Sequence, residues 1–413
     1  MLFVSTIYAQ SITNNFAIGS LSSNGNVFDA AIAHSGVALL DTNNYSLSNP
    51  ASWYGFKKVA FTTIFDGHNV TMNYDTPISN GFSRLTQLGI SFPFGKHIGV
   101  VIGLEPVSNV DGFIENNSDE VNYSQAQSGG LKRLYTGIGS RYGQISFGVK
   151  YGLLSGYLGQ RKLAAYNDDS YRWDAVEYAG NSTASDIQLG AIWAVNNEIN
   201  IGLSFSTPLK QITYTGDAQY FNYSRTLTND ANYLNWVSFN KDNISNTGSS
   251  LTFEENIDAL PTEINIGTSI QLGKKLSVQL AIDQKIFPSE TTNGQNAFLV
   301  PVGWKMNDCS SIRIGLIAHE KQKYSYNYFD RIKYGVGLYY GNDYVTNESS
   351  DISNVFKISG GLKFPLSKDK STMSLSGYWG NRSNFGDLPS EELLGFSLGI
   401  SVNEIWFVKA KRR

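Results

Sequence analysis

Basic side chains on the polar face of the predicted strands are the residues best placed to do chemistry. Period-2 alternation puts several cations on that face, with Glu263 and Asp283 among them. The candidates are Arg133, Lys150, Arg313, Lys333 and Lys357. Guanidinium and ammonium groups that face one space attract a carboxylate or another acid headgroup. These cations, and Lys363 with them, could instead pair with acids of the chain such as Asp29 and Asp41, so both interpretations stay open.

Catalysis and metal binding find little support. The four histidines are scattered along the chain, at His34, His68, His97 and His319. No HExxH, GxSxG or P-loop spacing is present. The acids around Asp230 lack the ligand order of a calcium loop. The single Cys309 excludes an intrachain disulfide framework and a cysteine-based zinc cluster. We therefore expect a protein that is not an enzyme and has no cofactor.

Composition excludes several classes of protein. Only 16% of the 413 residues are charged, against about 25% in an average soluble domain. The net charge of −3 provides no basic footprint for nucleic acid. No apolar run approaches the roughly 18 residues of a membrane-spanning helix. With 24 Tyr and 23 Phe, the chain has too many aromatic residues for a disordered protein. A large β-protein remains.

Alternation of apolar and polar residues is the main structural signal. Leu276, Val278, Leu280 and Ile282 are apolar, and the residues between them are small or polar. With this run there are fourteen, and the others lie near residues 58–66, 82–94, 98–107, 130–140, 145–153, 185–195, 199–208, 262–272, 310–320, 331–341, 353–366, 371–380 and 394–400.

Short and long connections alternate between these runs, which is typical of an outer-membrane barrel. Short links include 95–97 and 273–275, and longer polar stretches include 108–129 and 288–309. A soluble β-sandwich alternates too. An even number of strands, small residues on the polar face and aromatic residues near strand ends favour the barrel. We therefore predict an all-β fold, a transmembrane antiparallel β-barrel of about 14 strands.

Glycine recurs on the polar face of the predicted strands. In a strand, glycine often marks a bend or the close approach of another backbone. The lumen could thus be emptied to admit a plug, a ligand path or both, or the glycines could ease the curvature of the barrel. These residues are Gly89, Gly99, Gly103, Gly148, Gly190, Gly202, Gly267, Gly315, Gly335, Gly337, Gly395 and Gly399.

The N-terminal region does not alternate and is rich in small residues, which suits a segment that threads back into a barrel as a plug. Its run AIAHSGVALLDTNNYSLSNPASWYG resembles the plug of FadL-type outer-membrane transporters, whose hatch ends in an Asn-Pro-Ala motif, here Asn49, Pro50 and Ala51. The stretches GISFPFGKHIGVVIGLEP and LPTEINIGTSIQLGKKLSVQLAIDQ resemble hairpins of that family, and the ending FSLGISVNEIWFVKAKRR resembles one branch of it. Pro50 fixes its own φ and biases Asn49 toward extended conformations, so the motif predicts a defined corner between plug and barrel.

The predicted organisation has four parts. The start, MLFVSTIYAQ, resembles a secretory leader without its basic region, with a plausible cleavage site at Ala9, although residues 1–9 could instead form an ordinary β-strand. The parts are a truncated signal peptide at 1–9, a plug at 10–55, a barrel at 56–403 with long extracellular loops at 157–182 and 211–258, and a periplasmic tail at 404–413.

Aromatic residues in the longest predicted loop form a second candidate site. They include Tyr220, Phe221, Tyr223 and Trp236. Amphipathic rings at the mouth of a barrel could bind apolar molecules weakly, or they could form a collar at the membrane interface.

The resemblance implies an exported protein of the bacterial outer membrane. We expect a monomer surrounded by outer-membrane lipid that takes up a hydrophobic or amphipathic, fatty-acid-like small molecule passively, with no nucleic-acid partner. The alternative is a non-transporting barrel that serves as a partner or scaffold of a secretion or surface-assembly machine. A kinked strand or a lateral gap in the wall would distinguish a transporter from a sealed scaffold.

Overall fold

The computed structural model describes most of the chain. The described residues are 4–7, 11, 18–22, 25–41, 45–74, 77–95, 97–117, 120–166, 173–223, 247–288, 304–320, 327–347, 352–367, 371–383 and 389–404.

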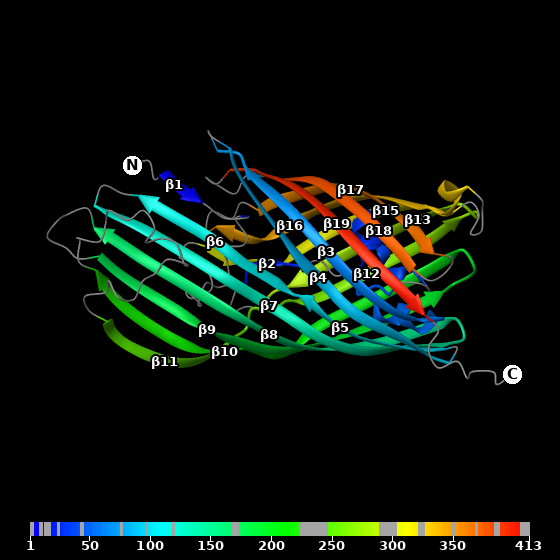
Figure 1. Cartoon of the computed structure of the whole chain (residues 1–413), viewed down its shortest axis with the longest axis horizontal. Coiled ribbons are helices and arrows are strands. Elements are labelled where there is room, and N and C mark those ends of the chain that lie inside the picture. The colour runs from blue at the N-terminus through cyan, green and yellow to red at the C-terminus, as the bar shows by residue number, and fades with distance from the viewer. Residues whose placement is uncertain are drawn as a thin grey trace.

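The chain forms a closed antiparallel barrel of fourteen strands (Figure 1). Neighbouring strands pair in order, and the last strand pairs with the first to close the ring. The ring consists of β3 (Val59–Met72), β4 (Ile78–Phe94), β5 (Ile98–Pro106), β7 (Val121–Tyr142), β8 (Ile145–Tyr166), β9 (Trp173–Ala194), β10 (Ile199–Tyr223), β12 (Thr262–Leu272), β13 (Leu276–Ile286), β15 (Cys309–Ala318), β16 (Lys333–Asn347), β17 (Ile352–Ser367), β18 (Ser371–Arg382) and β19 (Glu391–Glu404). Each predicted run of alternation lies in one of these strands, so the predicted fold is confirmed.

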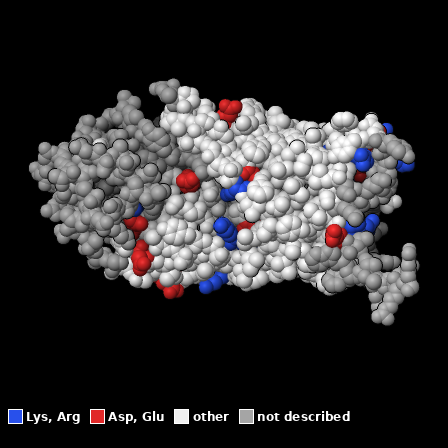
Figure 2. Space-filling view, viewed as in Figure 1, with Lys and Arg blue, Asp and Glu red and all other residues white. Residues whose placement is uncertain are grey.

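Apolar side chains cover the outside of the ring. On β13, Leu280 and Ile282 are exposed, whereas Ala281 between them and Gln279 and Asp283 on either side are buried. Charged side chains are sparse over much of the face seen in Figure 2. An apolar outer wall on a closed ladder is the arrangement that lipid requires of a β-protein, because it leaves no unpaired strand edge in hydrocarbon.

Helices contribute little to the fold. Within the described ranges, no helix is both long enough and apolar enough to cross a bilayer.

Several strands extend well past the rest of the ring. A membrane crossing needs about 9–11 residues per strand, yet β10 has 25 and β8 and β9 have 22 each. The strands β6 (Ser108–Asn117) and β11 (Thr247–Ile257) pair with β7 and β10 in this extension, and β14 (Trp304–Met306) pairs with the end of β16.

The loop predictions at 157–182 and 211–258 were therefore partly wrong. Residues 157–166 and 173–182 continue β8 and β9, while 211–223 and 247–257 belong to β10 and β11. Apolar and polar residues do not alternate regularly in these parts of the strands, and the prediction relied on that alternation.

The wall breaks in one strand. β5 ends at Pro106 and β6 begins at Ser108, within a stretch predicted to become a loop. Pro106 has no N–H to donate, and the Val107 N–H donates to the Leu131 carbonyl. β5 pairs with β4 over Leu88–Phe94, but in the described part of the chain no ladder joins β6 to the outer half of β4, residues 78–87. The two strands diverge toward the long-strand end of the barrel (Figure 1).

The described residues between Ile18 and Phe56, hereafter the inner segment, lie inside the ring. They contain β2 (Ser20–Leu21), α1 (Val27–Ala31), η2 (Gly36–Ala38) and η3 (Pro50–Gly55). α1 contacts β16 to β19, η2 contacts β10, β12 and β13, and η3 contacts β5, β7, β8 and β9. A short segment that touches strands all around a closed ring can only occupy its lumen.

Part of the predicted leader is a strand in this structure. β1 (Val4–Ile7) pairs antiparallel with residues Ile114–Asn117 of β6. Cleavage near Ala9 stays a prediction.

The barrel geometry predicts how two matched substitutions differ. Leu280→Arg puts a cation on the lipid-facing side of the ring and is expected to lower the free energy of unfolding by about 2–4 kcal/mol in a bilayer. Leu251→Arg, on the exposed extension strand β11, should cost less because water reaches that position. Equilibrium unfolding in lipid vesicles measures both, and equal losses would contradict the assignment of the two faces.

Candidate functional site

Glycines of the ring make room for the inner segment. A Cβ atom at Gly139 would lie 2.6 Å from the carbonyl oxygen of Pro50, and one at Gly202 would lie 2.5 Å from that of Val37. Most of the predicted inward glycines face the inner segment in this way: Gly89, Gly99, Gly148, Gly190, Gly202, Gly267, Gly315, Gly335, Gly337 and Gly399. Gly103 and Gly395 instead face the rings of Tyr135 and Tyr378. Close approach of the inner segment therefore accounts for most of these glycines.

Asn49, Pro50 and Ala51, the residues of the predicted corner, lie where η3 begins. Asn49 is extended, with φ −152°, and its Oδ1 accepts a hydrogen bond of 3.0 Å from the Ala51 N–H. Its Nδ2 lies 2.9 Å from the Val37 carbonyl and 3.2 Å from the carbonyl of Leu203 on β10. Pro50 starts η3, where its missing N–H costs nothing. One amide side chain thus joins two parts of the inner segment to the wall.

Polar contacts also attach residues 31–41 of the inner segment to the wall. Ser359 on β17 donates to the Ala31 carbonyl at 3.0 Å and accepts from the Ala33 N–H at 3.1 Å. Lys363 pairs with Asp41. In this pair a lumen cation binds an acid of the N-terminal region, as one of the two interpretations of the cations expects.

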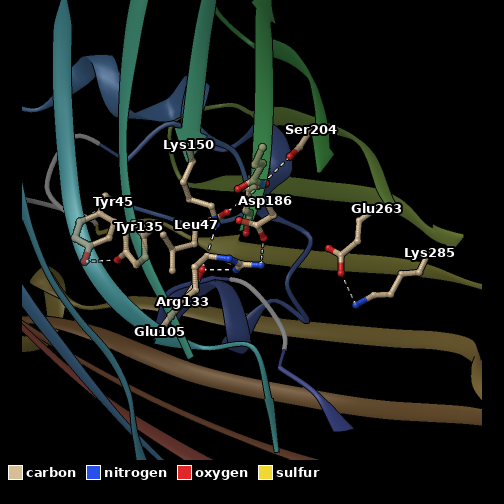
Figure 3. A network of polar contacts seen from close by, with 12 residues as sticks. Tyr45, Leu47, Glu105, Arg133, Tyr135, Lys150, Asp186, Ser204, Glu263 and Lys285 are labelled. Carbon is tan, nitrogen blue, oxygen red and sulfur yellow. Dashed lines mark hydrogen bonds and ion pairs between the residues drawn. The ribbon is translucent and has the colours of Figure 1, made fainter. Parts of the chain in front are cut away.

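A buried charge network lies beside η3 in the lumen (Figure 3). Arg133 on β7 contacts Glu105 at 2.6 Å and also pairs with Asp186 on β9. Lys150 on β8 lies 3.2 Å from the same Glu105. The hydroxyl of Tyr135 lies 3.2 Å from that of Tyr45 in the inner segment. Buried charges need partners because removing them from water is costly, and here each partner comes from a different strand.

The candidate cations do not gather around one empty space. Arg133 and Lys150 belong to the network just described, Arg313 lies 2.8 Å from Asp283, and Lys333 lies 3.3 Å from Glu320. Lys357 differs from these four.

Lys357 has aromatic neighbours in place of an acid. Its Nζ lies 5.5 Å from the centre of the Tyr339 ring and 5.1 Å from that of Tyr378, a distance at which a cation is attracted to a π-system. No carboxylate among the described residues comes within 4.0 Å of it. Of the five candidates, Lys357 is thus best placed to meet an acid.

A lumen cavity of about 340 Å³ lies next to Lys357. This volume is within the usual range of ligand pockets, about 300–1,000 Å³. Val70, Val355 and Leu393 form an apolar cluster on its wall, and Tyr339 and Tyr378 pack against that cluster. Polar and charged side chains complete the lining, among them His68, Arg84, Arg313, Asp343 and Arg382. The cavity combines a small apolar surface with a cation, as an amphipathic acid would require.

Sequence reasoning missed Arg84. Counting by twos from Gly89, which faces inward, places Arg84 on the lipid side. The β3–β4 register shifts between Ile64 and Phe65, so that Ile64 pairs with Gln87 and Asp66 pairs with Arg84. A β-bulge of this kind reverses the alternation, and both Gln87 and Arg84 line the cavity. The sequence shows no local sign of the bulge.

The long-strand half of the lumen contains the largest set of buried apolar side chains that pack together. Leu131, Leu154 and Leu158 are buried there with Ile212 and Tyr214 of β10. Residues of the chain connections, including Leu260 and Phe287, pack against them. The interior of a water-filled porin is polar, so this lumen has a different lining.

Three of the four aromatic candidates lie in a strand. Tyr220, Phe221 and Tyr223 lie in the last residues of β10, a strand rather than the predicted loop. Trp236 lies outside the described residues. As for metals, the described residues contain no group of three or more His, Cys, Asp or Glu positioned to hold an ion.

A family model described as BamG matches residues 1–412. The chain belongs to the BamG family. This family carries a different name from the FadL-type transporters that the sequence resembled. No curated protein matches the sequence.

Solved structures share the fold at low sequence identity. The CymD monoaromatic hydrocarbon channel is 11% identical, with a TM-score of 0.61 over 94% of this chain and 99% of its own. A Pseudomonas aeruginosa FadL homologue is also 11% identical, with a TM-score of 0.60 over 94% and 99%. The Ralstonia pickettii toluene transporter TbuX is 11% identical, with a TM-score of 0.56 over 95% and 99%. The resemblance to FadL-type proteins therefore holds for the fold of this BamG family member.

Glycine substitution tests whether close packing against the ring holds the inner segment in place. Gly148→Val places a side chain where the Pro50 backbone lies, and overpacking of this kind costs about 1–3 kcal/mol. Hydrogen exchange of residues 45–56 should become faster. Gly360→Val is the matched control, because a Cβ there meets only one atom, at 3.8 Å. Unchanged exchange in the Gly148 variant would mean that the segment does not depend on this fit.

Proposed function

We propose that this protein is an outer-membrane channel for the passive uptake of hydrophobic or amphipathic small molecules. The observation that carries the proposal is the break between β5 and β6. Pro106 at the break, and Gln87 and Arg84 on the facing part of β4, all line the lumen cavity. A lateral gap beside a cavity is the feature expected of a transporter and not of a sealed scaffold.

The lining of the lumen supports the same function. An apolar molecule gains nothing from a water-filled pore, but it can partition into a lumen with apolar walls. The apolar cluster around Leu154 and Leu158 lies in the long-strand half, and the cavity lies next to it along the barrel. Leu21, which lines the cavity, also packs against that cluster. The two regions are therefore adjacent, which supports the proposal that a ligand passes from one to the other.

The inner segment acts as the plug in this proposal. Its fit against the ring glycines closes the end of the lumen where the turns are short, and release of the ligand requires it to rearrange around Asn49, Pro50 and Ala51. Export, location in the bacterial outer membrane, a monomeric state and the absence of catalysis belong to the same proposal. The apolar belt, and a fold shared with proteins described as hydrocarbon channels, support it.

The ligand class is proposed to include fatty-acid-like acids, with Lys357 as the cation that meets the headgroup. Arg133, Lys150, Arg313 and Lys333 already have carboxylate partners. They would bind an acid only by exchanging those partners. Lys357 would exchange only its contacts with tyrosine rings.

Uptake by proteoliposomes tests both the function and the role of Lys357. Wild-type protein should admit labelled octanoate and octanol faster than empty vesicles. Lys357→Met keeps the unbranched side chain up to its last atom and removes its charge. It should slow octanoate about tenfold relative to octanol, since a hydrogen bond to a charged group contributes about 1.5–3 kcal/mol.

Lys333→Met is the control, because Lys333 pairs with Glu320 and is not among the residues that line the cavity. Equal loss of octanoate and octanol uptake in the Lys357 variant would remove the headgroup role. Wild-type uptake no faster than that of empty vesicles would refute the channel.

A second function, as a partner or scaffold of a larger assembly, is supported by the extension. The strand β11 pairs with β10 and, in the part of the chain described, with no strand on its other side. Its Leu251 is 65% exposed. An unpaired strand edge is a template for another chain.

Cross-linking in native membranes tests the second function. A scaffold should give a stoichiometric partner cross-linked through a photoreactive residue at position 251, and Leu251→Asp should abolish it. Recovery of only lipid adducts at that position would exclude the extension as a docking surface.

A further inference from the structure

Two exposed lysines lie on the outer side of the ring, on β7 and β10. Residues two apart in a strand share a side, so Lys132 is on the same side of β7 as Leu134, which is 53% exposed. Lys210 on β10 is the register partner of Ser185, which shares a side of β9 with the exposed Leu189. Both lysines therefore point to the surroundings of the barrel and not to its lumen.

The strand register places hydroxyl side chains between these lysines. Lys132 pairs with Ser155 of β8, and Ser155 pairs with Thr183 of β9. Lys210 pairs with Ser185, two residues from Thr183 on the same side of β9. Because adjacent strands lie about 4.8 Å apart, the two lysines are roughly 15 Å from each other. Lys132, Ser155, Thr183 and Lys210, all exposed, are hereafter the polar row.

The polar row marks one edge of the apolar belt. Toward the short turns, the exposed side chains next to it are leucines: Leu134, Leu153 and Leu209. Toward the ends of the long strands, they are mostly hydroxyls and amides: Tyr157, Asn181 and Thr215. The row is therefore at the height where the hydrocarbon of a bilayer would give way to headgroups.

The two lysines are available to an anion from the membrane. In the part of the chain that the structure describes, no carboxylate lies within 4.0 Å of either ammonium. A lysine at the edge of an apolar surface extends its ammonium toward the headgroups. The acids of this wall lie farther out, since Glu254 pairs with Thr215 and Asp217 comes two residues later. Cations are thus at the height of lipid phosphates, and acids are above them.

The wall continues above the polar row. β7, β8 and β9 have 22 residues each and β10 has 25, and they reach well beyond the other strands of the ring (Figure 1). A headgroup that stands above its acyl chains beside these four strands would lie against protein. The wall there presents the Tyr157 ring, 43% exposed, and the Asn181 amide. Hydroxyl and amide groups both donate and accept hydrogen bonds, as the hydroxyls of a sugar require.

We propose that the polar row is a binding site for a phosphorylated glycolipid of the outer leaflet. Lys132 and Lys210 bind its phosphate groups at the edge of the hydrocarbon, since an ammonium binds phosphate as a point charge. The sugars lie against Ser155, Thr183 and the wall above them. A phospholipid offers the phosphate but no sugar. The inference uses the proposed location in the outer membrane and does not depend on uptake.

Native mass spectrometry of the full chain in detergent, titrated with diphosphorylated lipid A, tests the site. Lys132→Gln and Lys210→Gln should each weaken binding about tenfold, because each removes a hydrogen bond to a charged group. Lipid A from which both phosphates have been removed should bind the wild-type protein about as weakly as intact lipid A binds the double variant.

The matched control removes two exposed lysines from the opposite end of the barrel. Lys274→Gln with Lys275→Gln, in the short turn between β12 and β13, should leave lipid A binding unchanged. Equal weakening by the control and by the double variant of the polar row would show a general attraction of charge and would overturn the site.

The sugar contact has a separate test. Thr183→Val keeps the shape of the side chain and removes its hydroxyl. It should weaken lipid A binding about threefold, as expected for a neutral hydrogen bond, and should not change the binding of phosphatidylglycerol. If phosphatidylglycerol binds the wild-type protein as tightly as lipid A does, the row accepts any anionic lipid and the glycolipid proposal fails.

Photocross-linking in native outer membranes tests the site where the protein works. A photoreactive residue at position 155 should give glycolipid adducts, and one at position 275 should give phospholipid adducts. Phospholipid adducts alone at position 155 would refute the proposal. A protein that takes up neither octanoate nor octanol would still give these results, so failure of the channel and failure of the lipid site are distinguishable.

Discussion

Closure of the hydrogen-bonded ladder is the constraint on which the rest of the structure depends. A strand in hydrocarbon has no water to satisfy its backbone, so each edge must meet another strand. The pairing of β19 with β3, from Glu404↔Val59 to Glu391↔Met72, removes the last two edges of the sheet. Once the ring is closed, apolar side chains face lipid and the small residues between them define a bore. The inner segment can then occupy that bore because glycines leave its inner surface open to a second backbone.

The break in the wall between β5 and β6 follows the same rule. Where β6 leaves β4, its free edge is paired by β1 and β2. The chain thus supplies its own hydrogen-bonding partners at the place where the barrel does not. Those partners come from an N-terminal region tied to the wall by few bonds, whereas a barrel strand is paired along both sides. The contacts that close this gap are therefore less stable than the ladders that join neighbouring strands of the ring.

The lumen charges show how tertiary contacts decide the role of a residue type. Alternation alone predicts that Arg133, Lys150, Arg313, Lys333 and Lys357 face the lumen, and Arg313 and Lys357 line the lumen cavity. Four of them have carboxylate partners contributed by neighbouring strands or chain connections, and these pairs stabilise the packed interior. Only Lys357 faces rings in place of acids. The sequence contains both the cations and the acids, but the register that brings Arg133 next to Asp186 joins residues 53 positions apart.

The amino-acid sequence by itself determined the ring: its fourteen strands and its two faces. Contact with lipid on one side imposes an alternation of apolar and polar side chains on every crossing strand. Proline fixes its own backbone φ. The tertiary structure alone decided the long extension of β8, β9 and β10, the inward position of Arg84, the partners of the lumen charges and the pairing of β2 with β6. Each of these depends on register, on a bulge or on contacts between distant segments. Such features involve pairs of residues that no local pattern connects, so they exist only once the chain has closed on itself.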